Sequence, residues 1–179
     1  MIKCFFLDRD GVVNVDKGYV HKWEDFELCA GFVEAASIIQ ENGYKIFIIT
    51  NQSGIARGKY TVQQFEKLKS LMITYLKANG VFIHSVKYCP HLDNGSVKKY
   101  GVECDCRKPR PGMIIELINE YDISLKDSFL VGDKPSDIEA GVSAGVGNLF
   151  KVGESCKVFD QYYPGHKSLL DIVKETFYL

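Results

Sequence analysis

Short runs of continuous apolar residues alternate along the chain with longer segments whose apolar residues recur at helical spacing. Continuous apolar runs of a few residues predict strands that are buried on both faces, as in parallel sheets. The predicted strands are Cys4–Leu7, Ile46–Ile49, Val86–Tyr88, Phe129–Val131 and Leu149–Val152.

The segments between these runs carry the start and stop signals of helices. Thr61 and Gln64 stand at capping-box spacing, and Gly80 follows the last periodic residue of that segment. Pro111 suits the first position of a further helix. The predicted helices are Phe32–Asn42, Thr61–Asn79, Gly112–Tyr121, Pro135–Ala144 and His166–Phe177. This alternation predicts a doubly wound, Rossmann-like α/β fold with a parallel sheet between helices, in one domain over residues 1–179.

Polar residues follow four of the predicted strands directly. The segments are Asp8–Gly11, Thr50–Gly54, Cys89–His91 and Gly132–Asp133. In open α/β sheets, ligands bind outside the carboxyl ends of the strands. We therefore expect these segments to converge on one active site.

Composition narrows the class of protein. The net charge of -1 leaves no broad basic field for nucleic acid or anionic membrane, so an anionic substrate must be held by a few local cations. No apolar run approaches the roughly 18 residues of a membrane span. We expect a monomeric cytoplasmic protein that binds neither membranes nor nucleic acid. In that compartment its cysteines should stay reduced.

Three acids stand at predicted strand ends: Asp8, Asp10 and Asp133. Alone, Asp8 and Asp10 fit a turn or a simple divalent-metal site as well as catalysis. A third carboxylate at the same edge would raise the mutual repulsion unless a cation lay among them. Oxygen ligands of this kind favour Mg²⁺ together with substrate phosphate. One carboxylate could then act as nucleophile and another as general acid and base.

Two further residues could stabilise a transferring phosphoryl group, which needs positioning and charge neutralisation above all. Thr50 and the backbone near Asn51 could hold phosphate oxygens, and Lys108 could supply a cation. The alternatives are a capping role for Thr50 and a solvated surface position for Lys108.

The order of these parts resembles the four motifs of the haloacid dehalogenase superfamily of phosphatases. The matching parts are Asp8-Arg9-Asp10-Gly11-Val12, Thr50, Lys108 and Gly132-Asp133-Lys134-Pro135-Ser136-Asp137. The resemblance implies Asp8 as nucleophile and Asp10 as general acid and base. It implies Mg²⁺ held by the Asp8 side chain, the Asp10 backbone carbonyl and Asp133, with Thr50 and Lys108 stabilising the phosphoryl group. Asp137 is expected to orient Lys134 or a metal-bound water.

Four potential soft ligands precede Lys108: Cys89, His91, Cys104 and Cys106. Three thiolates and one imidazole can form a closed structural zinc site, although these pairs are spaced more tightly than in common zinc fingers. Buried or free cysteines are the alternative, and a redox pair is disfavoured because C-x-C is not C-x-x-C. The segment between the pairs has little core-forming pattern, so a Zn²⁺ ion would give it a reason to be ordered.

No insertion is long enough for a large cap domain, so loops must shape the pocket. The segments FLDRDGVVNVDKGYVH, TNQSGIARGKYT, YCPH, CDCRKPRPGM and VGDKPSD look very like the D-glycero-D-manno-heptose-1,7-bisphosphate 7-phosphatases. This resemblance implies a phosphoric monoester hydrolase, of the type named for the β anomer, that releases the 7-phosphate of a heptose bisphosphate in the nucleotide-heptose route to lipopolysaccharide. The substrate contacts it implies are Asp16, Lys17, Gly18, Tyr19, Thr50, Asn51, Gln52, Ser53, Arg107, Lys108 and Lys134.

Three other functions fit parts of this sequence but match it less well than a heptose-bisphosphate phosphatase. Histidinol-phosphate phosphatases share the acids and the cysteine pattern, but tend to have a shorter loop between the cysteine pairs and to lack the run Ser53–Gly58. Nucleic-acid 3′-phosphatases begin with a similar D-x-D-G, yet this chain has no basic surface pattern. A non-catalytic, metal-stapled binding module would have no use for all three acids.

Overall fold

A six-stranded parallel sheet forms the centre of the molecule, in a computed structural model that describes residues 1–178. Its order across the sheet is β3 (Ile83–Cys89), β2 (Lys45–Asn51), β1 (Cys4–Leu7), β4 (Phe129–Gly132), β5 (Asn148–Val152) and β8 (Gly165–His166). Each neighbouring pair in this order is parallel. The predicted doubly wound α/β fold is confirmed.

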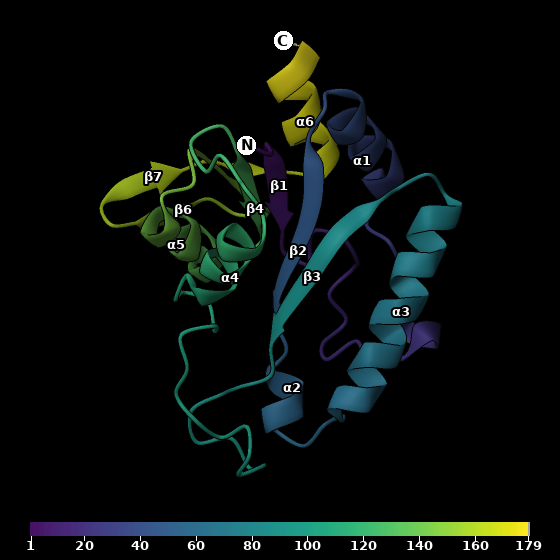
Figure 1. The fold of residues 1–179 in the computed structure, drawn as a ribbon, viewed down its shortest axis with the longest axis vertical. Coiled ribbons are helices and arrows are strands. Elements are labelled where there is room, and N and C mark those ends of the chain that lie inside the picture. The colour runs from purple at the N-terminus through teal and green to yellow at the C-terminus, as the bar shows by residue number, and fades with distance from the viewer. Residues whose placement is uncertain (179) are drawn as a thin grey trace.

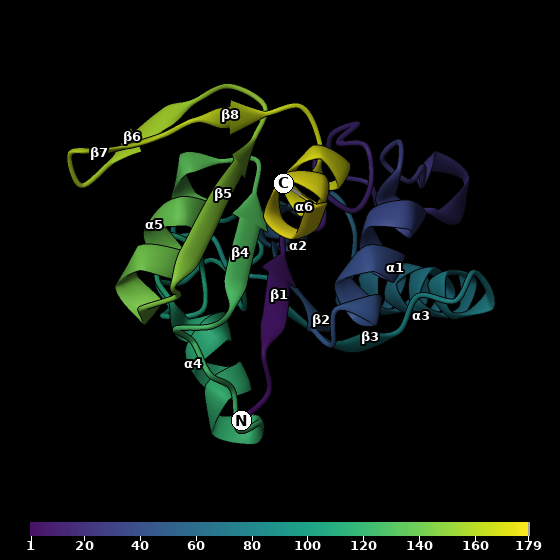
Figure 2. The same cartoon turned by 90° about the horizontal axis from the view of Figure 1, so that it is seen from above.

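Helices cover both faces of the sheet (Figures 1 and 2). One face carries α1 (Phe32–Glu41), α3 (Val62–Ala78) and α6 (Leu169–Tyr178), and the other carries α4 (Gly112–Glu120) and α5 (Pro135–Ala144). The shorter elements are η1 (Trp23–Asp25), α2 (Ser53–Ala56) and the antiparallel pair β6 (Cys156–Val158) and β7 (Gln161–Tyr163). Figure 2 shows this β6–β7 hairpin extending beyond α5 at one edge.

Alternation along β1 divides its side chains between two apolar cores. Phe5 and Leu7 pack with residues of α1, α3 and α6, whereas Cys4 and Phe6 pack with residues of α4 and α5. All four side chains are fully buried, which is why β1 is apolar at every position. The continuous run at Cys4–Leu7 is thus the signature of a central strand.

The end of the chain differs from the sequence-based prediction. His166 was expected to begin the last helix, but it lies in β8, and α6 begins at Leu169. Ser168 accepts a hydrogen bond from the N–H of Asp171 and so marks the true start of the helix. Pro111 precedes α4 rather than forming its first residue. The capping box of Thr61 and Gln64 is present as predicted.

The strand order places a topological switch point between β1 and β4. The chain runs from β1 outward through β2 and β3, then returns to the other side of β1 with β4 and β5. Loops that follow β1 and β4 therefore leave the sheet in opposite directions and open a crevice, the usual ligand site of such folds. The long segment 90–111 and α2 also lie together at this end of the sheet, where Val97 donates its N–H to the carbonyl of Ala56 (Figure 1).

Among the helices of residues 1–178, none combines the length and the apolar character that crossing a membrane requires.

Candidate active site and cysteine cluster

Asp8 and Asp133 meet at the switch point because they follow adjacent strands. Leu7 of β1 is paired with Val131 of β4, so Asp8 and Asp133 lie close together at the same end of the sheet, before their loops diverge toward opposite faces. Carboxylate oxygens of Asp8, Asp133 and Asp137 lie within 4.8 Å of one another. The structure thus brings together three acids from two distant parts of the chain.

Lys108 is buried among these acids, with 4% of its surface exposed. Its Nζ lies 2.7 Å from Asp137 Oδ1 and 2.9 Å from Asp8 Oδ1, and donates a hydrogen bond to the carbonyl of Ile49 at 2.9 Å. A solvated surface position, the alternative considered from sequence, is wrong. Burial alone would lower the pKa of Lys108, but the carboxylates of Asp137 and Asp8 outweigh it and raise the pKa. The ammonium group is therefore held charged beside Asp8.

Asp137 has two functions at the start of α5. Its Oδ2 accepts the backbone N–H of Lys134 at 2.9 Å, which satisfies a free donor of the first helical turn. Its Oδ1 faces Lys108. The sequence suggested that Asp137 orients Lys134; the structure adds that the same carboxylate holds Lys108.

Asp10 belongs to a separate group of contacts, although it is only two residues from Asp8. β1 ends at Leu7 and the chain turns at Arg9, so Asp8 and Asp10 do not lie on one continuous extended strand. Arg9, which is 1% exposed, places Nη2 at 2.7 Å from Asp10 Oδ1 and 2.9 Å from Oδ2. Asn14 and Gln52 donate further hydrogen bonds to the same carboxylate. Asp10 is thereby fixed from three sides at the crevice.

The acid group around Asp133 fits a divalent cation. Asp133 Oδ1 is buried and has no hydrogen-bond partner among the described residues. Burial raises the pKa of Asp8 to about 8; Lys108 opposes this rise, and Asp137, Asp133 and Asp10 add to it. Burial also raises the pKa of Asp133. A cation among these oxygens would relieve both the unsatisfied oxygen and the repulsion, and oxygen donors of this kind suit Mg²⁺.

Gly11 leaves the space that Asp133 occupies. It has φ +90°, and a Cβ at this position would lie 2.5 Å from Asp133 Oδ2. We expect Gly11→Ala to displace this carboxylate and to lower kcat by roughly 10- to 100-fold, the effect of misplacing a catalytic group by about 1 Å. Gly43→Ala is the matched control, because Gly43 also has positive φ but nothing within 4 Å. Equal activity of the two variants in a phosphate-release assay would contradict the expectation.

Beside Asp10 lies a cavity of about 190 Å³ lined by residues from three loops. Seven of the predicted substrate contacts are in its lining: Asp16, Gly18, Tyr19, Asn51, Gln52, Ser53 and Lys134. The Nζ of Lys134 lies 3.6 Å from Asp16, across the junction of two of these loops. A larger cavity of about 520 Å³ between β5 and β7 contains none of the predicted site residues, so size alone does not identify the site.

The remaining predicted contacts lie elsewhere. Lys17 is half-exposed and pairs with Glu27 at 2.7 Å, outside the cavity lining. Arg107 lines a neighbouring cavity together with Lys108 and donates to the carbonyl of His91 at 3.2 Å. Thr50 is buried, and its Oγ1 accepts a hydrogen bond from Gln52 at 2.8 Å.

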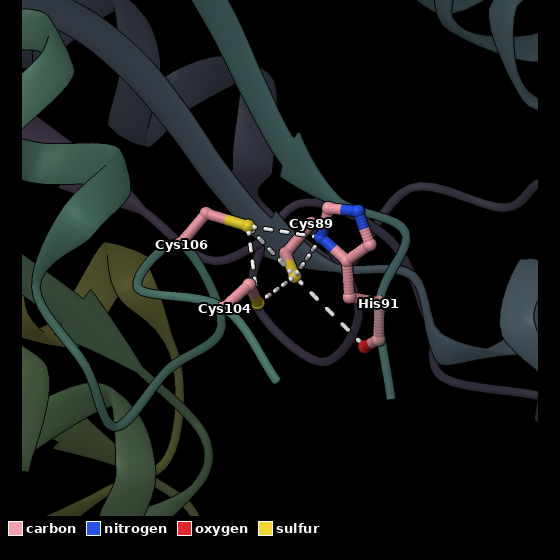
Figure 3. Close-up of side chains that lie close together, drawn as sticks. All are labelled: Cys89, His91, Cys104 and Cys106. Atoms are coloured by element: carbon pink, nitrogen blue, oxygen red, sulfur yellow. Dashed lines mark hydrogen bonds between the residues drawn. The ribbon is translucent and has the colours of Figure 1, made fainter. Parts of the chain in front are cut away.

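Cys89, His91, Cys104 and Cys106 form one compact cluster (Figure 3). The Sγ atoms are 3.1–3.5 Å apart, and His91 Nδ1 lies 3.4 Å from the Sγ of Cys106 and 3.8 Å from that of Cys89. These separations are far longer than the roughly 2.05 Å of a disulfide bond. They are close to the roughly 3.5–3.8 Å edges of a tetrahedron with Zn–S bonds of about 2.3 Å. The donor set and its geometry thus fit a closed zinc site.

The cluster is joined to the acid group through short connections. Cys89 ends β3, while Cys106 is followed by Arg107 and Lys108. Asn51 at the end of β2 clamps the Lys108 backbone, donating Nδ2–H to its carbonyl at 3.0 Å and accepting its N–H on Oδ1 at 3.1 Å. Lys108 is therefore positioned by the sheet on one side and by the cysteine loop on the other.

Comparison with known proteins decides the family. The family profile for polynucleotide kinase 3 phosphatase matches residues 2–149. The D-glycero-alpha-D-manno-heptose-1,7-bisphosphate 7-phosphatase of Campylobacter jejuni is 41% identical, covering 97% of this chain and 96% of that protein. The chain belongs to the heptose-1,7-bisphosphate 7-phosphatases. The corresponding enzyme of Vibrio cholerae, named for the beta anomer, is also 41% identical and covers 96% of this chain and 92% of its own.

Solved structures place this chain in the haloacid dehalogenase superfamily. A haloacid dehalogenase-like phosphatase from Mesorhizobium loti superimposes with a TM-score of 0.85 at 31% identity, covering 97% of this chain and 87% of the other. The D,D-heptose 1,7-bisphosphate phosphatase of B. bronchiseptica, in complex with magnesium and phosphate, gives a TM-score of 0.82 at 26% identity and covers 98% of both chains. The predicted phosphoric monoester hydrolase of this superfamily is confirmed.

Two members of the site were missed from the sequence. Arg9 was quoted only as part of a motif, yet it is the main partner of Asp10. Tyr60 stands in the segment TNQSGIARGKYT with no role predicted for it, yet its hydroxyl donates to Gln52 Oε1 inside the site. The position of Arg9 between two acids at a strand end could have signalled a structural ion pair. Nothing local to Tyr60 marks it as different from a packing aromatic.

Proposed function

We propose that this enzyme removes the 7-phosphate of D-glycero-D-manno-heptose 1,7-bisphosphate, leaving heptose 1-phosphate. The main support is the cavity beside Asp10, which gathers seven of the predicted substrate residues, from three separate loops, next to this acid. The names of the curated relatives support the same substrate.

Asp8 is the nucleophile in the proposed reaction. Its carboxylate attacks the phosphorus of the 7-phosphate, an aspartyl-phosphate forms, and the sugar oxygen leaves with the proton of Asp10. Asp10 then takes a proton from the water that attacks the aspartyl-phosphate, which releases phosphate and restores the Asp8 carboxylate and the protonated Asp10. Lys108, 2.9 Å from Asp8, and the hydroxyl of Thr50 stabilise the charge of the transferring phosphoryl group.

Asp8, Asp133 and the backbone carbonyl of Asp10 would hold Mg²⁺. When bound, this cation neutralises charge on the phosphoryl oxygens and on the surrounding carboxylates. The unpaired Oδ1 of Asp133 and the acid repulsion around Asp8 support this assignment. The magnesium in the B. bronchiseptica relative supports it independently.

Cys89, His91, Cys104 and Cys106 would hold a structural Zn²⁺. All four ligand positions are supplied by the chain, so no open position remains for substrate, as in structural rather than catalytic zinc sites. The free thiols of this cluster need reducing conditions, which supports a cytoplasmic location. One chain supplies every proposed site residue, so we propose that the enzyme acts as a monomer.

Substrate comparison tests the proposed function. With Mg²⁺ present, we expect phosphate release from the heptose 1,7-bisphosphate to exceed that from histidinol phosphate by at least tenfold in kcat/KM, and chelation of Mg²⁺ to abolish it. Both anomers should be assayed, because relatives named for each are equally identical to this chain. A 3′-phosphorylated oligonucleotide belongs in the same assay because of the matching family profile. Equal or faster turnover of either alternative substrate would overturn the assignment.

A further inference from the structure

The side chain of Gln52 links the two groups expected to act on opposite sides of the phosphoryl transfer. Its Nε2 donates to Asp10 Oδ2 at 3.2 Å and to Thr50 Oγ1 at 2.8 Å. Gln52 is 2% exposed, so water does not compete for these contacts. One amide therefore contacts both Asp10, which Arg9 and Asn14 also hold, and the threonine expected beside the phosphate.

An amide can perform this function in only one of its two orientations. Rotation by half a turn would direct Oε1 at Asp10, and whenever Asp10 is ionised two acceptors would then face each other. In the orientation observed, Oε1 accepts a hydrogen bond from the hydroxyl of Tyr60. Burial raises the pKa of this phenol, which keeps it a proton donor. Tyr60 thus supplies the hydrogen-bond donor that Gln52 Oε1 accepts.

The local sequence is built to bring Tyr60 to this place. Gly54 has no side chain, and a Cβ there would lie 2.1 Å from Tyr60 Cε1. His21 stacks on the Tyr60 ring at a centroid distance of 4.7 Å and an interplanar angle of 8°. The ring is therefore packed against both Gly54 and His21, and only 5% of the residue is exposed. A ring held this firmly presents its hydroxyl at one place.

We propose that Tyr60 is a positioning residue for the phosphatase reaction, acting through Gln52 to align the general acid Asp10 with Thr50. This inference rests on the proposed roles of Asp10 and Thr50. It also gives a physical reason for Gly54, since a side chain at that position would displace the ring that orients Gln52.

The effect of Tyr60 on catalysis should depend on the leaving group of the substrate. A sugar alkoxide is strongly basic and needs a proton from Asp10 as it departs, whereas p-nitrophenolate is a stable anion and departs without one. The constant kcat/KM reports steps up to phosphoryl transfer onto Asp8, before hydrolysis of the aspartyl-phosphate. Poor alignment of Asp10 should therefore lower kcat/KM for a sugar phosphate more than for p-nitrophenyl phosphate.

Tyr60→Phe tests this, because it removes one hydroxyl and keeps the packed ring. We expect kcat/KM for the heptose 1,7-bisphosphate to fall by about tenfold and that for p-nitrophenyl phosphate by less than about threefold, within the range that general acid catalysis contributes. Tyr163→Phe is the control, since Tyr163 is 6% exposed, lies on β7 and is outside the site. Thermal melting checks that both variants fold.

A double-mutant cycle tests whether Tyr60 affects kcat/KM through Gln52 or through a general change in structure. In a Gln52→Leu background, Tyr60→Phe should change kcat/KM by less than about twofold. Equal losses on both substrates, no loss, or additive losses in the double variant would each overturn the inference. If the wild type does not release phosphate from the heptose bisphosphate, the proposed substrate is wrong, and another sugar phosphate that it hydrolyses provides the alkoxide leaving group for the same comparison.

Discussion

Asp8→Asn is expected to abolish turnover while the protein stays folded. Asparagine keeps the size of the side chain and an oxygen that can accept from Lys108, which lies 2.9 Å from Asp8 Oδ1. It cannot form the aspartyl-phosphate, because the amide oxygen is a poor nucleophile at phosphorus. Loss of a covalent nucleophile lowers kcat by roughly 10⁴- to 10⁶-fold. Steady-state phosphate release measures the effect.

Thermal melting of the same Asp8→Asn protein shows whether the fold survives. The variant replaces a buried carboxylate with a neutral amide of the same size. It removes the cost of burying that charge and its repulsion with neighbouring acids, which offsets loss of the ion pair with Lys108, so we expect a Tm close to that of the wild type. Asp160→Asn is the matched control: Asp160 lies exposed in the turn between β6 and β7 and should keep full activity when replaced. Substantial residual turnover in Asp8→Asn would remove Asp8 from the nucleophile role.

Cys104→Ser is expected to remove zinc and with it the order of segment 90–111. The wild type should contain about one Zn²⁺ per chain by metal analysis, and the variant close to none. A structural zinc contributes on the order of 10 kcal/mol of apparent binding energy. Loss of even about 3 kcal/mol would lower Tm by roughly 6–12 °C in a chain of this length. Melting curves with and without chelator measure it.

The activity of Cys104→Ser tests whether the cluster positions Lys108. Cys106 is two residues from Lys108, so disorder at the cluster should reach the ammonium group and lower kcat by at least about tenfold. Cys156→Ser is the control, because Cys156 is partly exposed on β6 and lies outside the cluster. Unchanged kinetics in Cys104→Ser would show that Asn51 and the sheet alone hold Lys108, and absence of zinc from chelator-free wild type would reject the zinc site.

Local patterns were sufficient for most of the fold. The apolar runs predict β1 to β5 because a strand buried on both faces leaves a continuous hydrophobic segment in the sequence. The helix that follows Thr61 carries its own capping signal. β8 was missed because it has only two residues and pairs only with the end of β5, which is too short for any periodicity. The hairpin of β6 and β7 was missed because each of its strands has only three residues, which is also too short for a periodic pattern.

The residue types of the site could also be predicted from short stretches of the sequence. Asp8, Asp10, Asp133 and the four ligands of the cysteine cluster stand in short motifs next to strand ends, and residue type with spacing restricts the chemistry they can perform. Lys17 shows the limit of this reasoning, since it matches the resemblance by position yet pairs with Glu27 outside the cavity. A motif gives the position of a residue along the chain and does not give the direction of its side chain.

By itself, the sequence determined that this chain forms a parallel α/β sheet and carries the residues of a phosphatase, because apolar periodicity and motif spacing are properties of neighbouring residues. The tertiary structure alone decided which groups act together: Asp8 beside Asp133 at the switch point, Lys108 between Asp8 and Asp137, and Tyr60 behind Gln52. These contacts join distant segments. They depend on the order of the strands and on the packing of helices against both faces, which no local pattern encodes.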